Sequence, residues 1–254
     1  LGIVLFGTLY PLLAEAMGTK VSVGPPYFNP VGALFAVPML LVLLVGPLLR
    51  WRRDSLSRIG KWMILPFVAG LAALAAWIAL GGTGVLPFIG LVLAAALAVA
   101  SLLPLRGRSL GRVPLPLWGM VLAHLGIAVS LFGMACESAF SVERLVAAKV
   151  GDTTEVGPWR IRLAEVHPVA GPNWTAIEAG MAASYSGGKP VMLHPQARSF
   201  WTPPQQTSES ALLTRWNGQL YAVLGEQGED GRWQLRLWWK PFVTLIWLGG
   251  LLIA

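Results

Sequence analysis

Charged residues are scarce in this sequence, and so is cysteine. Only 12% of the 254 residues are Asp, Glu, Lys or Arg, whereas 55% are hydrophobic. Ordinary soluble domains contain roughly 25% charged residues, so the composition indicates a membrane protein. The single cysteine, Cys136, excludes an internal disulfide and a CxxC redox pair.

Familiar catalytic motifs are missing as well. The chain contains no P-loop, no GxGxxG after a strand and no HExxH. No pair of carboxylates has a spacing that suggests acid–base catalysis. The motifs therefore assign no catalytic residue.

Acidic residues are few in the first half of the chain, although the formal net charge is +7 overall. Residues 1–136 carry nine Lys and Arg but only two acids, Glu15 and Asp54, whereas residues 137–240 carry ten residues of each sign. Most of the excess lies in two short segments, 50–61 and 106–112. Basic segments between membrane spans face the cytoplasm, so we place both there and expect no nucleic-acid partner.

Long hydrophobic runs are abundant, and about 20 apolar residues span a bilayer. Such runs cover residues 1–17, 31–49, 62–80, 85–105, 117–136 and 241–254. We therefore predict an α-helical integral membrane protein with about six transmembrane helices, the first and last of them partial. Because both ends of the sequence fall inside apolar runs, we also expect it to be part of a longer polypeptide.

The segment between the fifth and sixth runs has a different character. Gly- and Pro-rich turns separate short apolar or alternating runs, as in small β domains. These candidate strands cover residues 159–163, 190–193, 219–224 and 233–238. Trp238 and Trp239, next to the last apolar run, are the expected anchors at the membrane interface.

We predict three parts on this basis. A helical membrane domain covers residues 1–136, and a mostly β domain, either a barrel or a sandwich, covers residues 137–240 on the outer face. The start of a further transmembrane helix covers residues 241–254.

His124 is the only acidic or basic residue in the apolar run 117–136. An ionisable group within the membrane is by default a candidate for ion, proton or cofactor chemistry, and histidine is the commonest metal-ligating side chain. Alternatively, its imidazole hydrogen-bonds to a neighbouring helix. Gly119, Gly126 and Gly133 recur every seven residues, so a flat group or another backbone can approach closely along nearly one face, near His124.

Six short stretches are distinctive when they are taken together and in order. They are residues 7–11 (GTLYP), 20–29 (KVSVGPPYFN), 123–126 (AHLG), 171–174 (GPNW), 218–221 (GQLY) and 239–247 (WKPFVTLIW). The set resembles the C-terminal portion of the CcmF family of cytochrome c haem lyases, whose relatives include CycK and NrfE. The resemblance implies a multi-pass protein of the bacterial plasma membrane, active in system I cytochrome c maturation, with residues 137–240 in the periplasm.

The resemblance also implies an activity, cofactors and partners. Such a lyase joins haem through thioether bonds to the CxxCH cysteines of apocytochrome c, and it works with a CcmE-type haem chaperone and a CcmH-type subunit. It carries a stable haem b and binds the substrate haem transiently. His124, in AHLG, matches the family's second transmembrane ligand of haem b, and Gly126 would allow close approach. The other axial ligand would lie before Leu1.

One stretch departs from the family pattern. Where the family often has Pro-Glu-Lys-Arg, residues 195–198 read PQAR, which keeps Arg198 but not the acid. The resemblance therefore assigns no catalytic role there. Arg198 or Lys20 could pair with haem propionates.

Two other classes of function remain open. In a secondary transporter or haem exporter, His124 would be a proton relay, although the helices offer little besides Glu15 as a second buried charge. In a non-catalytic scaffold, the helices would only anchor the outer domain. His167 and His194, in that domain, are either ligands or incidental surface histidines.

Overall fold

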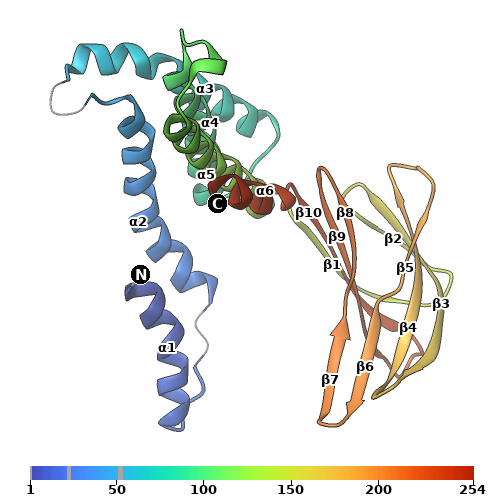
Figure 1. The fold of residues 1–254 in the computed structure, drawn as a ribbon. Helices are drawn as coiled ribbons and strands as arrows, with labels where there is room; N and C mark the ends of the chain where they lie inside the picture. Colours follow the sequence, from blue (N-terminus) through green and yellow to red (C-terminus); the bar gives the residue numbers. More distant parts are fainter. Residues whose placement is uncertain (1, 22–23, 51–53) are drawn as a thin grey trace.

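A computed structural model describes residues 2–21, 24–50 and 54–254 of the chain. It has a helical part and a β part, and the β part lies at one end of the helices (Figure 1). Ser22 and Val23, from the stretch 20–29, lie outside the described residues, and so do residues 51–53 of the first basic segment.

The helical part follows the apolar runs. Its α-helices are α1 (Gly2–Ala16), α2 (Pro25–Val45), α3 (Leu56–Ala79), α4 (Val85–Leu102), α5 (Leu115–Phe140) and α6 (Thr244–Ile253). Among the described residues, α2 to α5 are long and apolar enough to cross a membrane, whereas α1 and α6 are shorter. The predicted class, a multi-pass helical membrane protein with a mostly β insertion, is confirmed.

Helices α2 and α3 begin earlier than the apolar runs indicated. Helix α2 starts at Pro25 rather than at residue 31, so the predicted loop at 18–30 is shorter than expected. Proline suits the first helical positions because its missing N–H would have no partner there and its fixed φ is already helical. Helix α3 starts at Leu56, where the Ser55 hydroxyl accepts a hydrogen bond from the Arg58 N–H.

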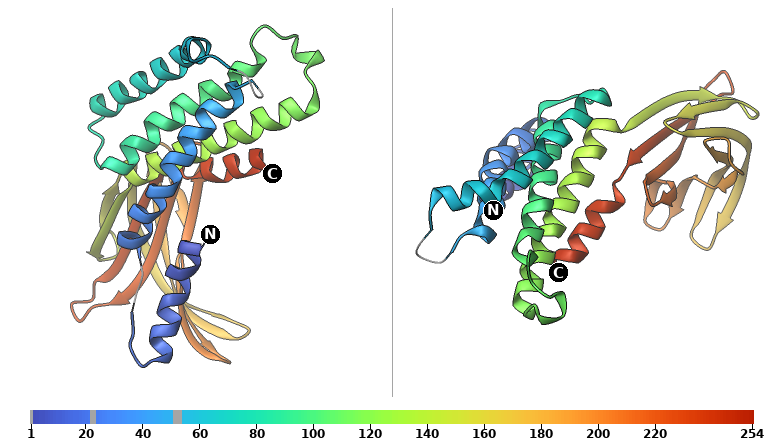
Figure 2. Two further views of the ribbon diagram at one scale, coloured as in Figure 1. Left: turned by 90° about the vertical axis from the view of Figure 1, so that its left-hand side faces the viewer. Right: turned by 90° about the horizontal axis from the view of Figure 1, so that it is seen from above.

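Helices α3, α4, α5 and α6 pack in this order as one bundle, and α2 packs on α4 (Figure 2). Small residues bring the helices together. A Cβ added to Gly90 of α4 would lie 3.1 Å from the Cβ of Ala135 of α5. Membrane helices associate through such close contacts, because burial of apolar surface gives no driving force within lipid.

The β part contains the strands β1 (Val142–Ala148), β2 (Thr153–Val156), β3 (Trp159–Gly171), β4 (Trp174–Tyr185), β5 (Val191–Leu193), β6 (Gln196–Trp201), β7 (Pro204–Glu209), β8 (Ala211–Arg215), β9 (Gly218–Gln227) and β10 (Trp233–Pro241). One sheet has the order β1-β10-β9-β8, and the other has the order β2-β3-β4-β6-β7, with β5 paired to β4. Every pairing is antiparallel.

Apolar side chains of both sheets form one core in the β part. Trp159 and Met181 from one sheet pack with Leu220 and Leu237 from the other. Trp239, expected at the membrane interface, belongs to this core and is only 6% exposed. The strand alternation explains the difference, since Leu235, Leu237 and Trp239 are buried on one face of β10.

Two adjacent chain crossings join the β part to the helices. Helix α5 runs to Phe140, past the predicted boundary at 136, and leads into β1, while β10 leads into α6. Because β1 pairs with β10, the two crossings lie side by side. An ion pair between Lys240 Nζ and Glu137 Oε1, 3.1 Å apart, lies at this junction.

Candidate functional site

His124 lies in the middle of α5 and is half-buried. Its Nδ1 is 2.8 Å from the backbone carbonyl oxygen of Met120, one turn earlier. A carbonyl oxygen only accepts hydrogen bonds, so this contact places the ring proton on Nδ1 and leaves the lone pair on Nε2. No hydrogen-bond partner for Nε2 is found within residues 2–21, 24–50 and 54–254.

This arrangement has the form of a metal-ligating histidine. Such a histidine donates one ring N–H to a backbone carbonyl or a carboxylate, which fixes the tautomer and the ring orientation for the other nitrogen. An apolar helix would otherwise bury the free acceptor at a cost in free energy. His124 thus fits an axial ligand of a haem iron.

Gly126 and Gly133 face α6. A Cβ on Gly126 would lie 2.6 Å from the carbonyl oxygen of Gly249, and one on Gly133 would lie 3.0 Å from the backbone nitrogen of Ile246. Between them, the Ser130 hydroxyl donates a hydrogen bond of 3.1 Å to the Ile246 carbonyl. The close approach expected at Gly126 is therefore made by a second backbone.

His124 points to a different side of α5 from these glycines. Consecutive residues are about 100° apart around a helix, so His124 is turned by roughly 200° from Gly126. The expectation that the glycine face lies close to His124 is therefore wrong. His124 shares its side with Ala128 and Ala135, which pack against α4. The imidazole and the α6 seam occupy opposite sides of one helix.

A proton relay through His124 would need further titratable groups beside it. Among the described residues, no acidic or second histidine side chain is hydrogen-bonded or ion-paired to His124. In that same part of the chain, no group of three or more His, Cys, Asp or Glu side chains is arranged to hold a metal ion. The described helices therefore offer one imidazole without a relay partner.

The other two histidines share one carboxylate on the β part. His194 Nδ1 and His167 Nε2 lie 3.2 Å and 3.7 Å from Oε1 of Glu178, and Gln196 donates to its other oxygen. We did not single out Glu178 from the sequence. The short hairpin turn between Gly171 and Trp174 was the available signal, because its register places His167 opposite Glu178.

Arg198 continues this network. Its Nε donates to Gln196 at 2.7 Å, its Nη1 lies 3.2 Å from Glu209, and its guanidinium lies 4.4 Å from the ring centre of Trp174. Arg198 is thus already paired within the β part. Lys20 is exposed in the segment that follows α1, and the two residues after Val21 are outside the described part.

Comparison with known proteins places this geometry in a family. A family profile described as the CcmF C-terminal beta-sandwich matches residues 139–241, which include every strand of the β part. The cytochrome c-type biogenesis protein CcmF of Escherichia coli K12 is 36% identical over 260 residues, which cover 99% of this chain and 40% of that protein. The chain belongs to the CcmF family and corresponds to its C-terminal portion. His124 and the seam between α5 and α6 therefore lie in a CcmF-type membrane domain.

Other relatives agree with this assignment. The biogenesis protein CycK of Bradyrhizobium diazoefficiens is 36% identical over 270 residues, covering 99% of the chain and 40% of CycK. NrfE of Haemophilus influenzae is 28% identical over 253 residues, covering 98% of the chain and 40% of NrfE. The chain thus spans about two fifths of the length of these relatives.

The fold itself also has a solved counterpart. A structure titled Cytochrome c Heme Lyase CcmF superimposes with a TM-score of 0.75 at 24% sequence identity, covering 99% of this chain and 41% of that one. The arrangement of membrane helices and β-sandwich is therefore the CcmF fold.

Proposed function

We propose that this protein acts in the covalent attachment of haem to apocytochrome c, as a membrane subunit of a cytochrome c haem lyase. The similarity to proteins named for cytochrome c biogenesis, along almost the entire chain, supports this function. The observation that carries the proposal is the state of His124, whose Nδ1–H is held by Met120 and whose Nε2 is left to ligate iron.

His124 is then an axial ligand of a haem b. The hydrogen bond to the Met120 carbonyl fixes the plane and tautomer of the imidazole. The second axial ligand would belong to the part of CcmF-family proteins that this chain does not span, since the chain covers 40% of the Escherichia coli relative. A haem held by two protein ligands supplies one-electron transfer, which would keep the substrate haem reduced.

The α5–α6 seam serves the same site from the opposite side of the helix. Gly126, Gly133 and Gly249 let α6 lie directly on α5, and the Ser130 hydroxyl links the two backbones. This contact fixes the rotation of α5 about its axis, and therefore the direction in which the His124 ring points.

The positive-inside rule supports the proposed location, and the similarity to cytochrome c biogenesis proteins supports the proposed partners. The basic segments face the cytoplasm of a bacterial cell, which puts the β part in the periplasm beside the plasma membrane. There the protein receives substrate haem from a CcmE-type chaperone and meets apocytochrome c on a CcmH-type subunit. Each CxxCH thiol adds across one haem vinyl group, which forms the thioether bond.

A maturation assay tests this function. The full-length protein is expressed in a bacterium that lacks its own CcmF, and covalently bound haem in c-type cytochromes is measured. We expect wild type and His167→Ala to restore maturation, and His124→Ala at matched membrane levels to restore less than a tenth of it. Full restoration by His124→Ala would contradict the proposed role of His124.

A further inference from the structure

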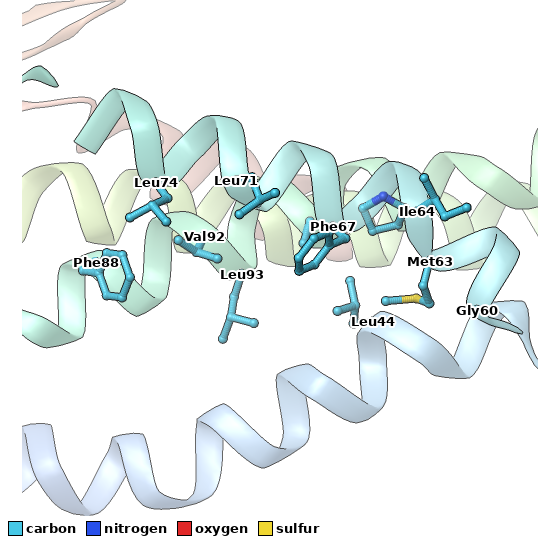
Figure 3. A pocket seen from close by; sticks show the side chains of 13 residues that line it. Leu44, Gly60, Met63, Ile64, Phe67, Leu71, Leu74, Phe88, Val92 and Leu93 are labelled. Atoms are coloured by element: carbon cyan, nitrogen blue, oxygen red, sulfur yellow. The ribbon is translucent and has the colours of Figure 1, made fainter. Parts of the chain in front are cut away.

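An apolar groove, about 460 Å³ in volume, lies on the helical part. Helices α2 and α3 both pack on α4, and the groove runs between them with α4 as its floor (Figure 3). Its walls carry large apolar side chains, among them Leu44 of α2, Phe67 and Leu71 of α3, and Leu93 of α4. Its volume is typical of a site for a small organic molecule.

One end of the groove opens beside the basic segments. Gly60 lines that end, and Lys61, the next residue of α3, is exposed. The Arg106 guanidinium lies 6.0 Å from the ring centre of Trp62, so the second basic segment reaches the same end. Lys61, near the start of α3, and Arg106, in the second basic segment, thus lie toward the same end of the helical part.

Both cations lack a local acid to neutralise them. Asp54 is the only acid within segments 50–61 and 106–112. Its carboxylate is held by the Arg58 guanidinium and by the Arg50 backbone N–H at 2.9 Å. A net positive charge therefore remains at the apolar opening, which favours an anionic ligand with an apolar tail.

The dimensions fit a lipid chain. From Gly60 to Leu74, α3 rises by about 21 Å, somewhat more than half of the roughly 30 Å hydrocarbon core. A packed protein helix is a poorer fit, because helix–helix contacts in membranes are enriched in small residues. The groove is lined mainly by bulky ones instead.

We infer that this groove binds one anionic phospholipid, with an acyl chain between α2 and α3 and the phosphate beside Lys61 and Arg106. The site is separate from His124, which lies on α5 and does not line the groove. The bound lipid would fill the gap between α2 and α3 and hold the start of α3 at the membrane surface.

Native mass spectrometry of the delipidated full-length protein tests this site, with palmitoyl-oleoyl phosphatidylglycerol and phosphatidylcholine as probes. We expect one phosphatidylglycerol to bind roughly tenfold more tightly than phosphatidylcholine, as two nearby cations allow. The double variant Lys61→Gln, Arg106→Gln should reduce that preference to less than threefold. Lys149→Gln with Arg162→Gln, which removes equal charge from the β part, should preserve it.

A second variant tests the groove itself. Leu71→Trp places a larger side chain in the wall of the groove and should weaken binding of both lipids at least fivefold. Ile78→Trp is the matched control on the same helix, because Ile78 is exposed and does not line the groove. The inference would be overturned if the two lipids bind equally, or if a variant and its control have equal effects. It would also be overturned if neither lipid binds tightly because another protein segment fills the groove.

Discussion

Hydrogen bonds to backbone carbonyls decide what the two key polar side chains of α5 can do. The Nδ1–H of His124 donates a hydrogen bond to the Met120 carbonyl oxygen of the same helix, so the other ring nitrogen, Nε2, is left for a ligand. The Ser130 hydroxyl instead donates a hydrogen bond to the Ile246 carbonyl oxygen of the neighbouring helix, and this bond links α5 to α6. One helix thus carries the proposed ligand on one side and its packing side toward α6 on the opposite side.

Gly126 permits a direct test of that packing side. A methyl group there would meet the Gly249 carbonyl oxygen at 2.6 Å, so Gly126→Ala should push α6 away at a cost of about 1–3 kcal/mol. We expect a clearly lower thermal midpoint of the purified protein in detergent. Gly119→Ala is the matched control, because no atom lies within 4 Å of an added Cβ on Gly119. Equal midpoints for the two variants would contradict the seam.

At the scale of elements, α3 depends on a polar cap at its first turn. The Arg58 side chain hydrogen-bonds to Asp54, and the Arg50 and Ser55 backbone N–H groups donate to the same carboxylate. In that order of importance, the Arg58 side chain and the Arg50 N–H hold the pKa of Asp54 well below its ordinary value. The charged carboxylate therefore ties the loop before α3 to the helix.

The sign of this shift gives a pH prediction. A carboxyl group whose pKa is lowered by folding stabilises the folded state fully above its unfolded pKa of about 4. This stabilisation is lost as the pH falls from the unfolded pKa through the lower folded pKa. Amide hydrogen exchange of residues 55–59 should thus be unaffected by pH between 5 and 8, after correction for intrinsic rates. Asp54→Asn should accelerate it at every pH in this range. The exposed ion pair Glu155–Arg160 provides the control, since Glu155→Gln should leave these amides unchanged.

Hydropathy predicted the long helices well because each apolar run is continuous, but it misplaced the ends that polar or proline residues occupy. Residues 25–30 read as a loop because they contain three prolines, yet two of these stand where a helix begins. Strands β1, β2, β4, β6, β7 and β8 lie outside the four predicted strands. In β2 and β7 few residues are apolar, so the alternation that reveals a half-buried strand is missing. Their positions follow from pairing with β3 and β6.

For the candidate site, the sequence identified His124 through its isolation in an apolar run. It could not show the tautomer, which depends on the distance to the Met120 carbonyl, or which side of α5 meets α6. The Glu178 network was also hidden, because only the register of β3, β4 and β6 brings its members together. Neighbours across a sheet depend on register, which a single sequence pattern does not specify.

At the scale of the whole molecule, the β part is tied to the helices at the junction of β10 and α6. The Phe242 N–H donates to the Asn217 carbonyl at 2.9 Å, which brings the turn between β8 and β9 to the start of α6. Trp216, in that turn, is 78% exposed and its ring centre lies 6.3 Å from that of Phe242. Trp216 is thus an exposed tryptophan beside the start of α6, whereas Trp239 is buried in the core of the β part.

We therefore expect Trp216 to enter the membrane interface. In liposomes containing brominated lipid, the loss of tryptophan fluorescence should fall measurably in Trp216→Phe. Trp201→Phe is a suitable control, because Trp201 is 53% exposed but lies at the hairpin of β6 and β7, away from α6 (Figure 1). If the two variants are quenched equally, the β part does not rest on the membrane at this turn.

The most direct test of the account is the visible spectrum of the detergent-purified full-length protein, recorded as reduced minus oxidised. Wild type and His167→Ala should show the sharp bands of a low-spin, six-coordinate haem b, because His167 belongs to the surface network around Glu178. His124→Ala should lose the haem or shift it to high spin. A low-spin spectrum retained by His124→Ala, or no haem in the wild type, would contradict the assignment of His124 as an axial ligand.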